Sequence, residues 1–271
     1  MTDLLRRLHG PDPLVCGILN VTPDSFSDGG AFGDRAAAVA HGLRLVAEGA
    51  DLVDVGGEST RPGSRSPGVA EELDRVVPVI EELAARISVP ISVDTSRPEV
   101  MAAAVRAGAT VINDVRALGN PGALEAAARL RVPVCLTHMP KPPHLMQRDP
   151  SYVDVVGEVR EFLLERTDAC ARAGIPREYV IVDPGFGFGK TLDHNLALLG
   201  SLRAFTELGA PVMVGLSRKA MLGRITGRPV DRRQAASVTA AVLAVQRGAQ
   251  VVRVHDVAAT VDALAILDAL G

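Results

Sequence analysis

The chain has 271 residues, longer than a typical domain but within the range of a single α/β barrel. Its composition, 47% hydrophobic and 23% charged, allows a large buried core and argues against disorder. A net charge of -3 and an aromatic content of 3% argue against a nucleic-acid or anionic-membrane partner, so we expect a small-molecule ligand.

The amino-terminal segment and the cysteines indicate the compartment. The first residues include two arginines but no apolar signal region, and no apolar run elsewhere is long enough to span a bilayer. We therefore expect a cytoplasmic protein. Cys16, Cys135 and Cys170 are far apart and form no CxxC pair, so they are predicted to be buried structural thiols.

Short β-branched segments alternate with longer Ala- and Leu-rich segments of helical period, which is typical of repeated βαβ units. In chain order, the predicted strands are Val15–Asn20, Leu52–Gly56, Ile91–Asp94, Thr110–Asp114, Val134–His138, Val180–Asp183, Val212–Leu216 and Val251–His255. The predicted helices are Arg35–Glu48, Val69–Arg86, Glu99–Ala107, Gly122–Leu130, Tyr152–Ala173, Leu192–Leu208, Arg232–Gln246 and Val257–Leu270. Eight such units, with no linker between them, predict a closed (β/α)8 TIM barrel that forms a single domain over residues 1–271.

The joints between these elements are also predictable. Four glycines are expected to cap helices in the left-handed conformation before the next strand: Gly49, Gly108, Gly209 and Gly248. The longest irregular stretches, Thr22–Gly33, Ser59–Pro67 and Pro140–Pro150, all follow strands. Loops in that position are candidate lids over a site at the carboxyl end of the barrel.

Every predicted strand has a polar residue at or near its carboxyl end. The strand-end residues are Asn20, Asp54, Asp94, Asn113, His138, Asp183, Ser217 with Lys219, and Arg253 with His255. Any single one of these is more simply explained as a cap of the next helix. Because the carboxyl ends of barrel strands meet at one face, all eight together indicate one shared site.

The last two strands carry donors suited to an anion. Arg253 and His255 are two residues apart on a strand and therefore point to the same side, near Ser217, Arg218 and Lys219 of the preceding strand. This is where barrels commonly bind phosphate, so the segment predicts a phosphate or diphosphate site. The alternative for Arg253 is an ion pair with a neighbouring aspartate such as Asp256.

The strands in the middle of the chain instead carry acceptors. Asp94, Asn113 and Asp183 are short side chains that would read the N–H groups of a planar heterocycle. Apolar contacts could cover the faces of such a ring: Ile18, Val115 and Met139. Each of these three, taken singly, is more simply a core residue. Glycoside hydrolysis by paired carboxylates fits poorly beside so many phosphate-type donors.

The glycine-rich segment 183–191 is not a P-loop, because the Walker spacing needs glycine at position 184, where the chain has Pro184. Its glycines also do not follow the GxGxxG spacing. Two interpretations stay open: a turn whose Phe188 packs on a ligand ring, or a purely conformational loop.

Seven segments together resemble the dihydropteroate synthase family, and they span almost the whole chain: GILNVTPDSFSDGG, DVGGESTRPGS, SVDTSRPEV, INDV, DPGFGFGKT, VGLSRK and VRVHDV. The resemblance implies a (β/α)8 barrel, usually a homodimer. It also implies an enzyme that joins 6-hydroxymethyl-7,8-dihydropterin diphosphate to p-aminobenzoate, releasing diphosphate with Mg2+. The reaction is thought to pass through a cation on the pterin methylene, flanked by carboxylates that stabilise it.

The resemblance also implies roles for individual residues. It places catalytic roles on Asp94, Arg61, Lys219 and Arg253. The pterin pocket would comprise Asp94, Asn113, Asp183, Lys219, Arg253, Met139, Phe188, Val115 and Ile18. The p-aminobenzoate site would comprise Phe26, Thr60, Pro62, Phe188, Ser217 and Lys219. The diphosphate would be held by Asn20, Arg61, Arg253 and His255, and Asn20 would also bind Mg2+.

Some alternatives stay open. Arg61 lies on a Gly-, Pro- and Ser-rich loop, where an arginine is ordinarily a solvated surface charge. The pair Pro140-Lys141 stands where many relatives have Gln-Gly, which leaves the shape of the fifth loop undetermined. Two competing functions are a pterin-binding barrel methyltransferase, which needs no diphosphate site, and a non-catalytic paralogue that binds pterin.

Overall fold

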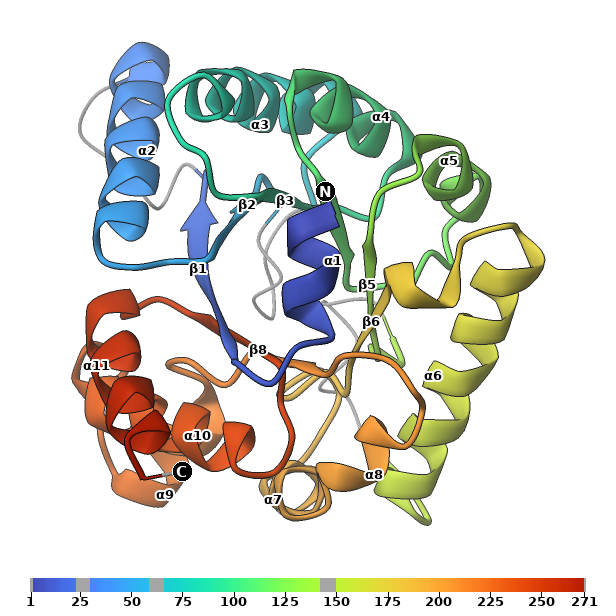
Figure 1. The fold of residues 1–271 in the computed structure, drawn as a ribbon, viewed down its shortest axis with the longest axis vertical. Coiled ribbons are helices and arrows are strands. Elements are labelled where there is room, and N and C mark those ends of the chain that lie inside the picture. Colours follow the sequence, from blue (N-terminus) through green and yellow to red (C-terminus); the bar gives the residue numbers. More distant parts are fainter. Residues whose placement is uncertain (1, 23–29, 59–65, 142–149, 271) are drawn as a thin grey trace.

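The computed structural model describes residues 2–22, 30–58, 66–141 and 150–270. Parallel strands form one sheet in the order β6-β5-β4-β3-β2-β1-β8-β7, with helices around the outside (Figure 1). The strands are β1 (Leu14–Asn20), β2 (Leu52–Gly56), β3 (Ile91–Asp94), β4 (Val111–Asp114), β5 (Val134–Thr137), β6 (Val180–Asp183), β7 (Met213–Val214) and β8 (Val251–Val254). A bridge between Val182 and Val212 joins the two ends of the sheet, which confirms the predicted barrel.

Apart from α1, which precedes β1, the helices follow the strands in sequence and cover the outer face of the barrel (Figure 1). They are α1 (Thr2–Leu8), α2 (Gly30–Ala47), α3 (Val69–Ala84), α4 (Pro98–Ala107), α5 (Ala123–Leu130), α6 (Val155–Arg172), α7 (Leu192–Gly200), α8 (Arg203–Thr206), α9 (Ala220–Thr226), α10 (Gln234–Val245) and α11 (Val257–Asp268), with 3-10 turns at Arg177–Tyr179 and Val230–Arg232. Among the described residues, no helix has both the length and the apolar character needed to cross a bilayer.

Local sequence explains where several helices begin and end. Asp154 caps α6, because its carboxylate accepts hydrogen bonds from the backbone N–H groups of Val156 and Gly157 at 3.1 Å. Pro98 occupies the first turn of α4, and Gly108 ends that helix with φ 119°. The other three predicted capping glycines also have positive φ, so that prediction is confirmed.

The amino-terminal helix closes the bottom of the barrel. In Figure 1, α1 lies across the centre of the ring of strands. Its Leu4 and Leu8 pack into a separate buried cluster with side chains from inside the barrel: Leu14, Cys16, Leu52, Val111, Cys135, Ile181, Met213 and Val251. All three cysteines are buried, as predicted. The barrel therefore has an apolar floor at the end where α1 lies.

The structure corrects several predicted elements. The expected helix Leu192–Leu208 is two helices, α7 and α8, which separate at Gly200 and Ser201, two residues of low helix propensity. The sequence reasoning missed α1 and α9 entirely. The last two strands are shorter than expected: β7 is Met213–Val214 rather than Val212–Leu216, and His255 lies just beyond β8 rather than within it. Ser217 and His255 still lie at the carboxyl end of the barrel.

Candidate active site

Side-chain alternation explains how polar groups gather at the open end of the barrel. On a strand, the residue two positions after a floor residue faces the same side of the sheet. From the floor residues Leu52, Val111, Ile181 and Val251, this step leads to the polar residues Asp54, Asn113, Asp183 and Arg253. The interior of the barrel is therefore apolar at the bottom and polar at the top.

Arg253 is the centre of this polar layer. Its Nε donates to Asp54 Oδ2 at 2.6 Å, and its Nη2 donates to Asp94 Oδ2 at 2.9 Å. Asn113 Nδ2 donates to the same Asp54 oxygen at 3.0 Å. Asp54, which is 1% exposed, thus fixes both a cation and an amide. The expected alternative, an ion pair of Arg253 with a neighbouring aspartate, is found with Asp54 and Asp94. It is not found with Asp256, which pairs with another arginine.

That other arginine is Arg218, which was predicted to be an anion donor. Its Nη2 lies 2.6 Å from Asp256 Oδ1 and its Nε lies 3.1 Å from Asp256 Oδ2, which is a bidentate ion pair. Ser217 and His255 remain together: the Ser217 hydroxyl accepts from the backbone N–H of His255 at 3.2 Å and lies 3.0 Å from its Nδ1. Of the predicted anion donors on these strands, Arg218 and Arg253 are thus both paired with carboxylates.

Two buried oxygens in the polar layer have no hydrogen-bond donor among the described residues. They are Oδ1 of Asp54 and Oδ1 of Asn113. Buried acceptors without a donor are costly, so each indicates a group that a bound ligand would satisfy. A planar heterocycle with several N–H groups has the donors that this layer lacks.

Burial sets the protonation equilibria of the pocket. It raises the pKa of Asp183, and Lys219 and the backbone N–H of Gly185 oppose that shift. Burial likewise raises the pKa of Asp94, against the attraction of Arg253. Burial lowers the pKa of Lys219 to about 8, although Asp183 pulls it upward. Carboxylates and cations therefore share one desolvated volume, where electrostatic interactions are strong.

Lys219 and Phe188 form one wall of this volume. The ammonium of Lys219 lies 4.5 Å from the centre of the Phe188 ring, a cation–π contact, and also donates to the carbonyl oxygen of Phe186. The backbone N–H of Gly185 donates to Asp183 Oδ1 at 2.7 Å. The turn after β6 thus contacts Asp183, which is predicted to bind pterin, and Lys219, which is predicted to contact p-aminobenzoate as well.

Two polar residues near the strand ends do not face the pocket. His138, one residue past β5, and Asp114, at the end of β4, belong to the alternate set of side chains that faces the helices. The His138 ring packs edge-on against Phe162 of α6, with ring centres 4.9 Å apart. The Asp114 carboxylate accepts from Ser96 and from the backbone N–H groups of Arg116 and Leu118. Inclusion of His138 among the shared-site residues was wrong.

The remaining predicted pocket residues are placed as follows. Ile18 follows Cys16 of the floor on the same face of β1 and is 5% exposed, and Met139 is 9% exposed. Val115 lies just past β4 and is partly exposed. Asn20 ends β1 and pairs in register with Gly56. Phe26, Thr60, Arg61 and Pro62 lie outside the described residues.

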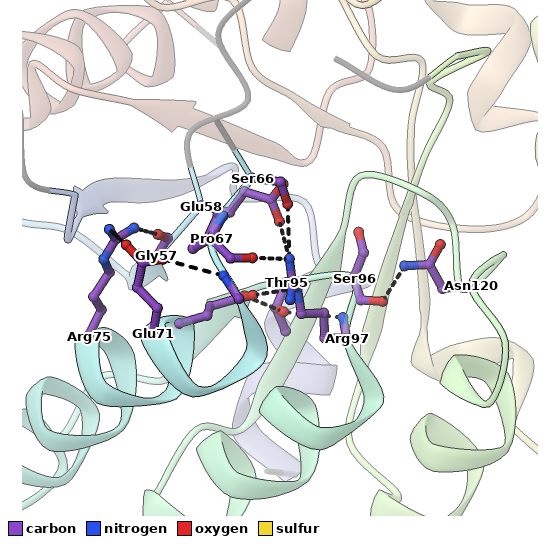
Figure 2. Close-up of polar contacts among 12 residues, drawn as sticks. Gly57, Glu58, Ser66, Pro67, Glu71, Arg75, Thr95, Ser96, Arg97 and Asn120 are labelled. Atoms are coloured by element: carbon purple, nitrogen blue, oxygen red, sulfur yellow. Dashed lines mark hydrogen bonds and ion pairs between the residues drawn. The ribbon is translucent and has the colours of Figure 1, made fainter. Parts of the chain in front are cut away.

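The segment that carries Thr60, Arg61 and Pro62 has stems that the structure does describe (Figure 2). Arg97, just after β3, donates to Ser66 Oγ at 2.9 Å and to the carbonyl oxygen of Pro67, on the carboxyl-terminal stem. Its Nη2 lies 3.9 Å from Glu58 on the amino-terminal stem. Sequence reasoning did not single out Arg97, because a surface arginine gives no signal.

A buried carboxylate fixes Arg97 itself. Glu72 of α3 is 0% exposed, and its Oε2 lies 2.9 Å from Arg97 Nε. Its other oxygen accepts from the hydroxyl of Thr95 at 2.5 Å. A second arginine, Arg75, donates to the carbonyl oxygen of Gly57 at 2.8 Å (Figure 2). Arg97 thus contacts both stems of this segment, and Arg75 contacts the amino-terminal stem.

The described residues offer few side-chain ligands for a magnesium ion. Among the described residues, no group of three or more His, Cys, Asp or Glu side chains is placed to hold a metal. Mg2+ commonly takes one or two protein oxygens and completes its shell with water and substrate phosphates. The amide oxygen of Asn20, on the strand beside β8, fits that second arrangement.

Fold and site together define a pterin-binding barrel enzyme, and residues 16–255 match the family of pterin binding enzymes. A dihydropteroate synthase of Escherichia coli K12 is 49% identical over 257 residues, which cover 95% of this chain and 91% of that protein. A Xanthomonas albilineans dihydropteroate synthase structure with 4-aminobenzoic acid is 57% identical, with a TM-score of 0.92 and coverage of 97% and 94%. A structure of the Xanthomonas albilineans enzyme with 7,8-dihydropteroate is 56% identical, with a TM-score of 0.88 and the same coverage. The chain belongs to the dihydropteroate synthase family.

Proposed function

We propose that this chain condenses 6-hydroxymethyl-7,8-dihydropterin diphosphate with p-aminobenzoate to give 7,8-dihydropteroate and diphosphate. The observation that carries this proposal is the buried layer of acceptors around Asp54, Asp94, Asn113 and Asp183. The family relationship supports it, since related structures contain 4-aminobenzoic acid and 7,8-dihydropteroate.

The pterin would bind at the polar layer, above the apolar floor. Asp183 and Asp94 would accept from its ring and amino N–H groups, and the unpartnered oxygen of Asn113 would accept another. Arg253, held flat by two carboxylates, would stack on the ring. Apolar neighbours of the pocket would cover the remaining ring surface: Ile18, Val115, Met139 and Phe188.

Reaction requires diphosphate to leave and the aniline nitrogen to attack the pterin methylene. The C–O bond to diphosphate breaks, a new C–N bond forms, and the nitrogen loses one proton. The carboxylates of Asp94 and Asp183 would stabilise positive charge on the pterin as the bond breaks. Arg253, His255 and Arg61 would hold the leaving group. Asn20 would be the residue that holds Mg2+, whose positive charge would help to stabilise the leaving diphosphate.

The p-aminobenzoate would lie next to the wall formed by Phe188, Lys219 and Ser217. Phe26, Thr60 and Pro62 would complete its site from the first two loops. A homodimer in the cytoplasm is part of the proposal and is supported by the family resemblance. Nothing described favours the methyltransferase alternative, whose substrate needs no diphosphate site.

Turnover by the purified protein tests this proposal. The protein is mixed with the pterin diphosphate, p-aminobenzoate and Mg2+, and dihydropteroate is followed by chromatography. We expect product that requires both substrates and that is lost when EDTA removes Mg2+. A folded protein that binds pterin but yields no dihydropteroate would show a non-catalytic paralogue, and the proposal would be wrong.

A further inference from the structure

The turn between β6 and α7 is built around a buried lysine, Lys190, which is 4% exposed. Its ammonium lies 2.9 Å from Nδ1 of His138 and donates to the carbonyl oxygens of Gly185 and Phe188 at 3.0 Å each. The carbonyl oxygen of His138 is a fourth neighbour at 3.4 Å. The N–H donors of Lys190 are therefore used in hydrogen bonds within the protein.

The glycines of the turn explain why carbonyl oxygens converge on one point. Gly185, Gly187 and Gly189 have φ of 72°, 80° and 58°, a left-handed conformation that redirects successive peptide groups. A Cβ on Gly185 would lie 2.0 Å from the carbonyl oxygen of His138, so the turn is packed tightly against the end of β5. Converging buried carbonyls need a donor, and Lys190 supplies it.

The surroundings of the lysine fix its partners. Burial, together with Lys190, lowers the pKa of His138 to about 3, so its ring is neutral and Nδ1 is free to accept. Burial lowers the pKa of Lys190 to about 7, and Asp183 opposes this shift. The ammonium form has three N–H groups for its three nearest acceptors, and the neutral amine keeps two of them.

Lys190 and Lys219 hold the same turn from opposite sides. Lys190 binds the Phe188 backbone from within, at its carbonyl oxygen. Lys219 lies over the Phe188 ring on the pocket side and donates to the neighbouring Phe186 carbonyl. The turn is further fixed by Asn195, whose Oδ1 accepts from the Gly187 N–H at 2.7 Å. Phe188 is only partly buried, so its ring position depends on this backbone.

We infer that Lys190 is a positioning residue for p-aminobenzoate: it holds the β6–α7 turn so that Phe188 and Lys219 face the second substrate. This inference rests on the proposed function, in which those two side chains contact p-aminobenzoate. In the proposed p-aminobenzoate site, the glycine-rich turn would have both of the roles considered from the sequence: its backbone conformation matters, and its Phe188 contacts the ligand. Lys190 acts through Phe188 and is itself outside the pocket.

A double-mutant cycle tests the inference. Lys190→Met keeps the length of the side chain but removes its donors, and Phe188→Ala removes the ring. Steady-state kinetics with both substrates is measured for each variant, for the double variant, and for Arg129→Met, a control on the exposed face of α5. We expect Lys190→Met to raise the KM for p-aminobenzoate about tenfold, with the KM for pterin diphosphate changed by no more than about threefold.

The cycle distinguishes positioning from general destabilisation. If Lys190 acts through Phe188, adding Lys190→Met to Phe188→Ala changes the KM for p-aminobenzoate by less than about twofold. Full additivity, or an unchanged KM in Lys190→Met, overturns the inference. If Lys190→Met does not fold, Lys190→Gln, which keeps two donors, is expected to show the same selective rise at smaller size. An inactive wild type would instead refute the proposed function, and this inference with it.

Discussion

Asp54 fixes the orientation of Arg253, although Asp54 is not among the residues expected to contact the diphosphate. One oxygen of Asp54 accepts from both Arg253 Nε at 2.6 Å and Asn113 Nδ2 at 3.0 Å. Asp54→Asn keeps the size of the side chain but removes its charge. The amide must also place an NH2 group in a position where the structure has a buried acceptor oxygen.

The magnitude follows from the bonds that are lost. A hydrogen bond to a charged group contributes about 1.5–3 kcal/mol, so kcat/KM for the pterin diphosphate is expected to fall by about 10- to 150-fold. Arg253 retains Asp94, at 2.9 Å, which limits the loss. Because Arg253 loses one of its two carboxylate partners in a partly buried position, the melting temperature is expected to fall as well.

A matched control lies at the other end of the same strand. Asp51 precedes β2, where it pairs with Arg7 at 2.5 Å and accepts from the backbone N–H of Val15 at 2.8 Å. Asp51→Asn is expected to lower the melting temperature while both KM values stay within about twofold of wild type. If Asp54→Asn is folded and retains wild-type kcat/KM, Asp54 does not orient Arg253 for the reaction.

Three further predictions concern the pocket wall and its supports. Burial lowers the pKa of Lys219 to about 8, so the charge of this side chain is lost as the pH rises. We therefore expect kcat/KM for pterin diphosphate to fall between about pH 7 and about pH 9, and Lys219→Arg to lack that decline. Gly185→Ala, which forces a contact with the His138 carbonyl, is expected to cost at least about 2 kcal/mol in urea unfolding, and clearly more than Gly174→Ala, where φ is 87° but nothing lies within 4 Å. Arg97→Met removes the donor shared by both stems of the second loop and is expected to lower kcat about tenfold without weakening pterin binding; an unchanged kcat would contradict that role.

Much of the fold was predictable because barrel strands carry strong local signals. Strands such as Leu52–Gly56 and Val180–Asp183 were predicted to their final residue, since each is a short β-branched run with clear ends: the first ends at a glycine and the second at an aspartate. The amino-terminal helix was missed because its role is tertiary. Only the assembled barrel shows that Leu4 and Leu8 close its floor.

The site was predictable at the level of residue type and less so at the level of contacts. Asp94, Asn113, Asp183 and Arg253 face one volume, as strand parity indicates. Parity also explains the failure at His138, which is in the alternate register. No local pattern could show that Arg218 pairs with Asp256 across two loops, because ion pairs between distant segments depend on tertiary geometry.

Pterin binding, measured by calorimetry, tests the central claim most directly, because it isolates the strand-end carboxylates from turnover. Asp183→Asn and Asp94→Asn replace acceptors by amides that offer donors, and Asp168→Asn, on α6, serves as a control. We predict that each of the first two variants loses at least about 2 kcal/mol of binding free energy, about 30-fold in Kd, while the control binds like wild type. Affinities within twofold of wild type in both pocket variants would contradict the assignment of this buried layer as the pterin site.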